Sequence, residues 1–302
     1  LGWRLPDVVA DRQSGRLERD LLAARHTSVR VAPHLMAAAR RTGRERGKSD
    51  PIDALAVARA AQREPNLPTA THDPISRDLK LLTDHRDRLV TQRTALINQA
   101  RWYLHELDPE FDDPSASLTA AIHQKRTAAW LKRQSGILAE VTAEYVACIA
   151  ARTVRINTVA KKITVIVDPV SVELQQIVGC GPLVAARLLG EVANITRFPN
   201  AESLARYGGL APVPVWSGST NGRVRMTRSG NRQINRAFHT ISLTQTRDNT
   251  HPGHTYLQKK TSEGKTNTEA RRSHKRVLAR PVYNAMLNDY NNRTNTASAV
   301  AA

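Results

Sequence analysis

The chain has 302 residues, with 45 Lys and Arg against 27 Asp and Glu, which gives a formal net charge of +18 at pH 7. Such an excess of positive charge indicates a polyanionic partner, usually nucleic acid, and argues against a purely structural helical protein. Aromatic residues make up only 4% of the chain, which disfavours RNA-binding modules that stack single-stranded bases on an aromatic sheet.

The cysteines and the apolar runs exclude further classes. Cys148 and Cys180 are far apart and lack histidines at ligand spacing, so we expect neither a zinc site nor a disulfide framework. No apolar run approaches the ~18 residues that a membrane span needs, and no signal peptide is visible. We therefore predict a cytoplasmic protein without a membrane partner.

The first 75 residues show the alternation of part of an α/β domain. Residues 16–25 alternate basic, acidic and leucine positions and predict an amphipathic helix. Residues 28–32 alternate at period two and end at a proline, which predicts a short strand. A basic stretch at 40–48 leads into a strongly helical run that begins at Asp50. These elements are too few for a complete sheet.

Two carboxylates, Asp50 and Asp53, open this helical run three residues apart. One interpretation is a helix cap, with Asp50 as the N-cap, Pro51 as the first helical residue and Asp53 as a capping-box acid. The other is a metal site, because nucleases of the RNase H type use such carboxylates to bind Mg²⁺. From these residues alone, both interpretations stay open.

Two long helical regions, residues 76–107 and about 118–167, occupy the middle of the chain. In the first, apolar residues recur every seven positions, while two arginines occupy places that a clean coiled-coil seam would keep apolar. The apolar positions are Leu82, Leu89, Leu96 and Tyr103, and the arginines are Arg86 and Arg93. The two regions suit a plain helical bundle or a spacer that serves in oligomerisation.

Residues 174–192 resemble a helix-hairpin-helix, with Gly179-x-Gly181 between two apolar segments. Such a hairpin turns backbone N–H groups toward a phosphate at a helix N-terminus. A plain glycine turn between two core helices accounts for the segment equally well.

A loop with distinctive turn chemistry follows at residues 208–233. Its two prolines cannot lie inside a helix and hold the backbone extended up to Trp216. Gly218 and the Asn-Gly pair at 221–222 then allow turns, so that Ser217 is presented on an ordered loop. By itself this segment favours an ordinary turn serine on a basic loop.

Five arginines follow this serine, and fixed positive charge beside a hydroxyl suits a group that meets a phosphate. They are Arg223, Arg225, Arg228, Arg232 and Arg236. Residues 229–231, Ser-Gly-Asn, indicate the start of the next helix. From Lys259 onward the chain is polar and basic, and we expect its last dozen residues to be disordered.

Five motifs occur in a characteristic order along the chain. They read G-K-S-D-P-I-D-A-L-A-V-A-R-A, R-W-Y-L-H-E-L-D-P, I-V-G-C-G, Y-G-G-L-A-P-V-P-V-W-S-G and R-S-G-N-R-Q-I-N. Together they resemble the bacterial insertion-sequence transposases of the DEDD-plus-serine class, the one-hundred-and-ten family of insertion sequences. The resemblance runs from about residue 16 to about residue 283.

This resemblance implies a mixed α/β but mostly helical protein in four parts. They are a RuvC/RNase H-like α/β domain at 1–75, a helical coiled-coil spacer at 76–170, a helical transposase domain with a helix-hairpin-helix-like segment at 171–260, and a basic C-terminal helix with a disordered tail at 261–302. The partners that it implies are DNA, a structured guide RNA from the element, and further copies of the chain in a dimer or tetramer. The implied location is the bacterial cytoplasm, in association with the nucleoid.

The family's site residues are carried over position by position. Ser217 matches the nucleophilic serine of the W-S-G motif, which attacks a DNA phosphodiester and forms a phosphoserine link. Asp50 and Asp53 match the last two of four metal-binding acids. We assign nucleic-acid contacts to Lys48, Gly179, Gly181, Arg223, Arg225, Arg228, Arg232 and Arg236.

The first two acids of the family's metal site do not carry over. The first aspartate stands upstream of Leu1 in the family, and the glutamate falls on Pro6 or Val8, with Asp7 and Asp11 out of register. We therefore expect an N-terminally truncated chain that binds Mg²⁺ or Mn²⁺ weakly. A transposase that exchanges DNA strands is the leading hypothesis. A non-catalytic nucleic-acid-binding remnant is the alternative.

Overall fold

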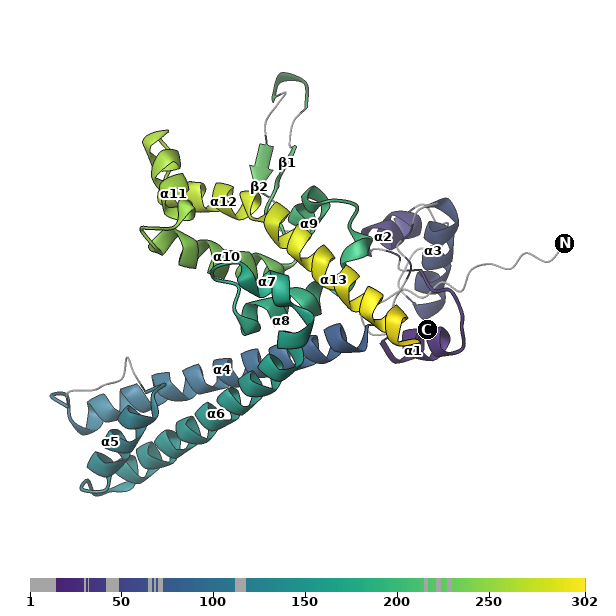
Figure 1. Cartoon of the computed structure of the whole chain (residues 1–302). Helices are drawn as coiled ribbons and strands as arrows, with labels where there is room; N and C mark the ends of the chain where they lie inside the picture. Colours follow the sequence, from purple (N-terminus) through teal and green to yellow (C-terminus); the bar gives the residue numbers. More distant parts are fainter. Residues whose placement is uncertain are drawn as a thin grey trace. The chain divides into compact units, whose positions relative to one another are not determined.

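The structure is a computed structural model, and its chain divides into two compact units, Leu1–Pro74 and Ile75–Ala302 (Figure 1). Each unit is described by itself below. The described residues are 15–29, 31, 33–41, 49–64, 67, 69, 73–111, 118–214, 217–220, 224–226 and 230–301.

The first unit contains three helices, α1 (Gly15–Ala23), α2 (Pro33–Arg41) and α3 (Asp50–Arg63). The predicted helix at 16–25 corresponds to α1. A small apolar cluster holds α2 and α3 together, and its buried members are Val31, Ala39, Ala56 and Ala60. Most of them are alanines, which let two helices approach closely.

The strand predicted at residues 28–32 is reduced to a single bridge. Val29 pairs with Thr69 in an isolated antiparallel bridge, and no longer strand occurs among the described residues of this unit. Residues 30 and 32 lie outside the described part. The described residues of this unit therefore lack the expected sheet. A strand forms only when it pairs with a neighbour over several residues, and here a single pair is present.

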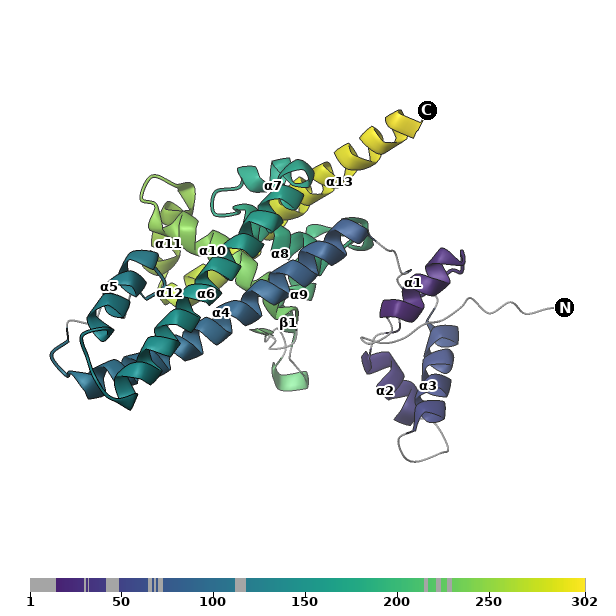
Figure 2. The same cartoon turned by 90° about the horizontal axis from the view of Figure 1, so that it is seen from below.

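The second unit begins with a pair of long helices, α4 (Pro74–Leu107) and α6 (Ile137–Val167), which run side by side in Figures 1 and 2. A shorter helix, α5 (Ala121–Leu131), packs against their far end. The buried apolar residues that join the three are Ile97, Ala100, Leu104, Leu118, Leu131, Val146 and Ile149. These helices correspond to the two long helical regions that the sequence predicts.

The seven-residue repeat of α4 is divided between two apolar clusters, because Leu96 packs against the one just described and Leu82 and Leu89 belong to the larger one. Leu89 is buried, and Tyr103 meets Tyr145 of α6 edge to face, with the ring centroids 5.6 Å apart. The seam arginines are partly desolvated, which lowers the pKa of both Arg86 and Arg93. Arg93 uses its position to donate from Nη1 to Thr153 Oγ1 of α6, at 3.3 Å.

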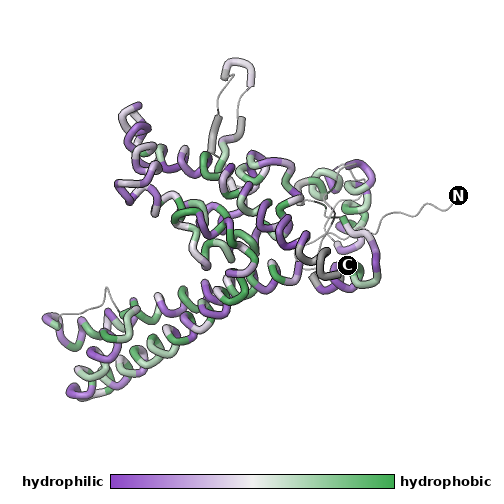
Figure 3. The backbone as a smooth tube through the Cα atoms, in the orientation of Figure 1, coloured by the Kyte–Doolittle hydropathy of each residue, from purple (hydrophilic) through white to green (hydrophobic). Residues whose placement is uncertain are grey.

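The rest of the second unit is a compact body of shorter helices. They are η2 (Asp168–Val170), α7 (Val172–Gln176), α8 (Pro182–Val192), η3 (Ile195–Arg197), α9 (Ala201–Tyr207), α10 (Arg232–Arg247), α11 (Pro252–Ser262), α12 (Asn267–Val277) and α13 (Ala279–Ala301). Its core lies where α8 meets α10, and the side chains of Leu188, Ile234, Phe238 and Ile241 are all fully buried there. Figure 3 shows hydrophobic residues gathered at α7, α8 and the adjoining part of α10, whereas α11 and α12 are mainly hydrophilic.

A two-stranded antiparallel ribbon projects from this body in Figure 1. Strand β1 (Pro212–Pro214) pairs with β2 (Val224–Met226), and the register places Val213 opposite Arg225. A short 3₁₀ turn, η4 (Gly218–Thr220), lies between the strands. The prediction of a mostly helical protein is confirmed, and this ribbon is the one sheet among the described residues.

The C-terminal tail, which we expected to be disordered, is helical as far as Ala301. The polar composition of the last residues predicted disorder, but the beginning of the helix is anchored in the core. Val282 and Met286 are buried in the core, and Tyr283 donates its hydroxyl to the carbonyl of Phe198 at 2.8 Å. Once a helix is nucleated by such packing, extending it by further residues is favourable. Among the described residues, each helix is too short or too polar to cross a bilayer.

Candidate nucleophile and nucleic-acid interface

Ser217 lies between β1 and η4, at the outer end of the ribbon, and its side chain is exposed. The backbone before it is extended in β1, as the prolines predict, because proline fixes its own φ and excludes helix. Gly218 follows with φ +38°, a turn that glycine adopts at little cost. Trp216 and residues 221–223 lie outside the described part. The hydroxyl is therefore presented where a macromolecular phosphate can reach it.

The two ends of the ribbon meet at a tight root made of glycines. Gly230 has φ +123°, and a Cβ there would stand 2.8 Å from both the Cα and the nitrogen of Gly209. Asn235 of α10 donates both amide hydrogens across this root, to the carbonyls of Gly208 and Gly209 at 3.1 Å each. Lys275 of α12 donates to the Oδ1 atom of the same amide at 2.8 Å, which fixes its orientation. Every hydrogen-bonding atom of this amide group thus has a partner.

Asn231 joins the ribbon root to α8 and α4. Its Oδ1 atom caps α10 by accepting from the N–H groups of Gln233 and Ile234, at 2.9 and 3.0 Å. Its Nδ2 donates to Glu191 Oε2 at 2.6 Å, and Lys80 Nζ of α4 donates to the other oxygen of Glu191 at 2.6 Å. Burial alone lowers the pKa of Lys80, but the hydrogen bonds and charges of Glu191 and Asp84 raise it overall.

These root residues belong to the motifs Y-G-G-L and R-S-G-N-R-Q-I-N, but the motifs alone did not indicate how they contact one another. The predicted start of a helix at residues 229–231 is correct, since α10 begins after the cap Asn231. No sequence motif indicated a role for Glu191 or Lys275. Each meets its hydrogen-bond partner, Asn231 or Asn235, only when helices distant in sequence pack together.

One of the predicted phosphate-binding arginines on α10 belongs to an ion-pair network. Arg236 Nη1 lies 3.3 Å from Asp87 Oδ2, although 61% of its side chain remains exposed. Arg187 of α8 donates to the other oxygen of Asp87 at 2.9 Å and to Gln233 Oε1 at 2.7 Å. Arg232, one turn earlier, is exposed and forms no ion pair with any described residue. Arg232 therefore has the freer side chain for an outside phosphate.

The other predicted basic contacts are described only in part. Arg225 has its backbone in β2, and its side chain is not among the described features. Lys48, Arg223 and Arg228 lie outside the described residues.

The two glycines of the hairpin-like segment differ in their surroundings. Gly179 has φ +89°, and a Cβ there would come within 2.9 Å of Thr244 Cβ and 3.0 Å of Ile241 Cα, so this glycine lets the turn pack on α10. Gly181 precedes α8, is exposed, and would have no atom within 4 Å of an added Cβ. Of the two, only Gly181 leaves room for a phosphate to approach its backbone.

In the first unit, the capping interpretation of the two carboxylates is wrong. Ser49 is the N-cap of α3 and accepts from the N–H of Ile52 at 3.4 Å, so Asp50 stands one residue inside the helix with its side chain exposed. Asp53 pairs with Arg40 of α2, with Nη1 and Oδ1 2.9 Å apart. The serine, which takes the cap, leaves both carboxylates for other partners.

These carboxylates match a divalent cation in chemistry but supply only part of a site. Mg²⁺ prefers six oxygen ligands, and Asp50 and Asp53 together contribute two or three. Arg40 already holds one oxygen of Asp53. The described residues contain no group of three or more His, Cys, Asp or Glu side chains placed to hold a metal ion.

Comparison with protein families matches two stretches of the chain. The transposase family described as IS116/IS110/IS902 matches residues 172–258, which include α7, α8, the ribbon and α10. A transposase family of the DEDD class of IS110 elements matches residues 10–109, which include both carboxylates.

Three proteins from insertion elements are similar to the chain. An uncharacterized 44.8 kDa protein of IS116 from Streptomyces clavuligerus is 26% identical over 272 positions, covering 74% of this chain and 67% of that protein. An uncharacterized 42 kDa protein of IS900 from Mycobacterium paratuberculosis is 27% identical over 311 positions, covering 85% of this chain and 76% of that protein. An uncharacterized 43.6 kDa protein of IS110 from Streptomyces coelicolor is 37% identical over 102 positions, covering 34% of this chain and 25% of that protein.

The root of the ribbon predicts a graded response at Asn231. We expect Asn231→Ala to lower the free energy of unfolding by about 2 kcal/mol, because it removes both the cap and the hydrogen bond to a charged carboxylate. Asn231→Ser keeps a capping oxygen and loses only the amide donor, so its loss should be about half as large. Urea unfolding monitored by circular dichroism measures both. Equal losses in the two variants would contradict the division of roles.

Proposed function

Because the chain belongs to the IS110/IS116/IS900 family of transposases, we propose that it binds DNA and exchanges DNA strands with Ser217 as the nucleophile. The observation that carries this proposal is the presentation of Ser217, which is exposed on a ribbon whose root is held by three helices. A reacting hydroxyl must be accessible to its substrate and held in a defined direction, and these features supply both conditions.

In the proposed reaction, Ser217 Oγ attacks a phosphorus atom of the DNA backbone. A bond forms between Oγ and phosphorus, and the bond to the leaving sugar oxygen breaks. The hydroxyl proton passes to a base and the leaving oxygen takes up a proton. A neutral serine is a poor nucleophile, so the proton must be removed and the phosphate charge offset. Arg232 and Arg236 on α10, together with Arg223, Arg225 and Arg228 of the sequence that follows Ser217, are the cations that we propose for this offset.

Asp50 and Asp53 are proposed as two ligands of a divalent cation. Mg²⁺ or Mn²⁺, when bound, would polarise a phosphoryl oxygen and stabilise developing charge. The carboxylates themselves would hold the cation, which would compete with Arg40 for Asp53, since Arg40 is already paired with that carboxylate. A site that must displace an arginine and has few protein ligands binds weakly.

The finer organisation is part of the same proposal. We propose a RuvC-like domain at 1–75, a coiled-coil spacer at 76–170, a serine transposase domain at 171–260 and a C-terminal helix from 261 onward. A structured RNA and further copies of the chain are the proposed partners besides DNA. Lys48 and Gly181 are proposed contacts to the backbone of the nucleic acid, whereas Gly179, which packs against α10, is not kept among them.

Binding to duplex DNA should depend steeply on salt. Each phosphate neutralised by Lys or Arg releases counterions, so log K should fall against log[salt] with a slope of about −0.9 per contact. Arg232→Gln should reduce the slope by about one unit and weaken binding at every sequence. Fluorescence anisotropy at several salt concentrations measures this. If the affinity for duplex DNA did not change with ionic strength, the proposed binding through phosphate contacts would be refuted.

Metal binding should be weak and should respond to Arg40. We expect dissociation constants near the millimolar range for Mn²⁺, measured by electron paramagnetic resonance, and loss of this binding in Asp50→Asn. Arg40→Gln should tighten binding because it frees Asp53. An N-terminal extension that carries the family's Asp and Glu should tighten it much further. Tight binding by the chain alone, unaffected in Asp50→Asn, would refute the assignment.

The nucleophile is tested by trapping covalent protein–DNA adducts, using the chain extended with a family-type N-terminal segment. Ser217→Ala should abolish the adducts and leave DNA affinity nearly unchanged, because only Oγ is removed. Ser219→Ala and Ser229→Ala are matched controls that should retain them. Adducts that persist in Ser217→Ala and vanish in a control would move the chemistry to that serine. DNA binding without adducts in any protein would favour the non-catalytic alternative.

A further inference from the structure

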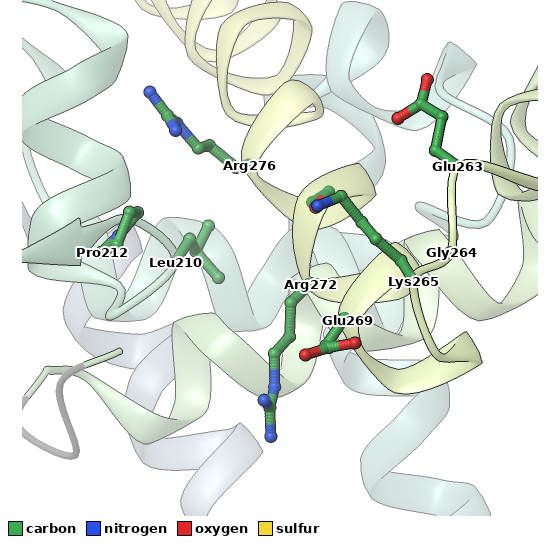
Figure 4. Close-up of a pocket in the computed structure, with 9 residues that line it drawn as sticks. Leu210, Pro212, Glu263, Gly264, Lys265, Glu269, Arg272 and Arg276 are labelled. Atoms are coloured by element: carbon green, nitrogen blue, oxygen red, sulfur yellow. The ribbon is translucent and has the colours of Figure 1, made fainter. Parts of the chain in front are cut away.

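Two hollows adjoin the root of the ribbon, and Pro212 and Arg276 line both. The first has a volume of about 530 Å³ and lies between Leu210, Pro212, the α11–α12 turn and one face of α12. The second, of about 290 Å³, lies between α9, Pro212 and the junction of α12 with α13. Figure 4 shows Arg272 and Arg276 projecting from α12 beside Leu210 and Pro212. The foot of the ribbon is therefore bordered by cations from a different part of the chain.

Four of these cations lie in chain order from the turn before α12 to the start of α13, and we name them the α12 basic row. Its members are Lys265, Arg272, Arg276 and Arg280. Arg272 and Arg276 are four residues apart, so they share one face of the helix with a rise of about 6 Å between them. Lys265 precedes α12 in the same hollow, and Arg280 opens α13 in the second one.

The acids near the row are already engaged. Glu263 accepts from Lys260 Nζ at 2.6 Å, and Glu269 accepts from the N–H and the hydroxyl of Thr266 at 3.0 and 2.8 Å. These hydrogen bonds lower the pKa of both carboxyl groups, which keeps the acids ionised in their local roles. Within the described residues, no acid forms an ion pair with a member of the row. Glu202, Glu263 and Glu269 line the hollows and offset part of the charge, but they are outnumbered by the cations there, so a positive excess remains for an outside ligand.

The linings of the hollows favour the backbone of a duplex over single-stranded nucleic acid. Proteins that hold single strands stack the bases on aromatic side chains, and among the described residues no aromatic side chain lines either hollow. Arginines at regular spacing on a helix suit successive phosphates, which fix the register of DNA without reading its sequence. The row lies beyond residues 172–258, the stretch that matches the transposase family.

The row is connected to the ribbon through α12. Lys275, on the same helix, orients the Asn235 amide that holds the ribbon root. Ser217 is five residues beyond Pro212, a reach of at most about 17 Å. On a duplex this distance corresponds to about half a helical turn. Ser217 therefore lies within about half a helical turn of Pro212, which lines both hollows.

We propose that the α12 basic row binds the phosphate backbone of duplex DNA and sets the position of the DNA relative to the ribbon. This proposal rests on the proposed function, because it takes the DNA held at Ser217 as its ligand. It adds a binding surface from the C-terminal helices to the arginines of the ribbon and α10.

The test compares charge-matched double variants of the full chain. Arg272→Gln with Arg276→Gln removes two members of the row. Arg126→Gln with Arg133→Gln removes the same charge from two exposed positions, one in α5 and one just after it. The ligand is a 25-base-pair duplex, and anisotropy is measured from low to physiological salt. Thermal unfolding of each variant checks that the fold is kept.

We expect the row variant to lose about 1.8 units of salt slope, because two phosphate contacts are removed, and to bind at least tenfold more weakly. The control should keep the wild-type slope. Arg272→Lys with Arg276→Lys keeps the charge and should restore most of the affinity.

Two outcomes would overturn the inference. One is a row variant that behaves like the control on duplex DNA. The other is a row variant that loses only structured-RNA binding, which would make the row an RNA surface. If the wild type itself binds duplex DNA weakly and without salt dependence, the proposed function fails instead. The two failures are therefore distinguishable.

Discussion

The arrangement of the second unit depends on a clamp at the root of the ribbon. Two strands of three residues each cannot hold a direction in water, because an isolated hairpin of this size is marginally stable at best. The direction comes from the root, where the Asn235 amide bonds to two carbonyls and Gly230 presses against Gly209. The second contact needs glycine, since a Cβ at Gly230 would collide with the backbone of Gly209. The exposed serine inherits its orientation from this contact.

Part of the high positive charge of the chain is neutralised by carboxylates that each accept hydrogen bonds from two side chains. Asp87 accepts from Arg187 and Arg236, and Glu191 accepts from Lys80 and Asn231. Each acid joins helices that are distant in sequence, so the scarce negative charges hold the body together. Other cations, such as Arg232 and the α12 basic row, are exposed, so that a polyanion can reach them.

The sequence predicted those features that local chemistry determines. Proline and glycine spacing gave the extended lead-in and turn around Ser217, and heptad periodicity gave the long helix that contains Leu89. It could not predict contacts between distant segments. Asn231 meets Glu191 at a separation of 40 residues, and the acceptor of Lys275 lies 40 residues earlier in the chain. Ser49 outcompeted Asp50 as a cap because both are good caps and only the backbone geometry decides. The helical state of the last dozen residues was missed because the anchors of this helix lie before its polar end.

The close contact between α8 and α4 has a mechanical consequence. A Cβ at Gly190 would stand 2.8 Å from the backbone nitrogen of Lys80, so the two helices meet backbone to backbone without a cushion of side chains. Lys80 then reaches Glu191, which in turn holds the cap of α10. Such a joint has almost no freedom to slide. A tilt of the long helices α4 and α6 would therefore be transmitted to the ribbon. A partner that binds these helices would thereby change the orientation of Ser217.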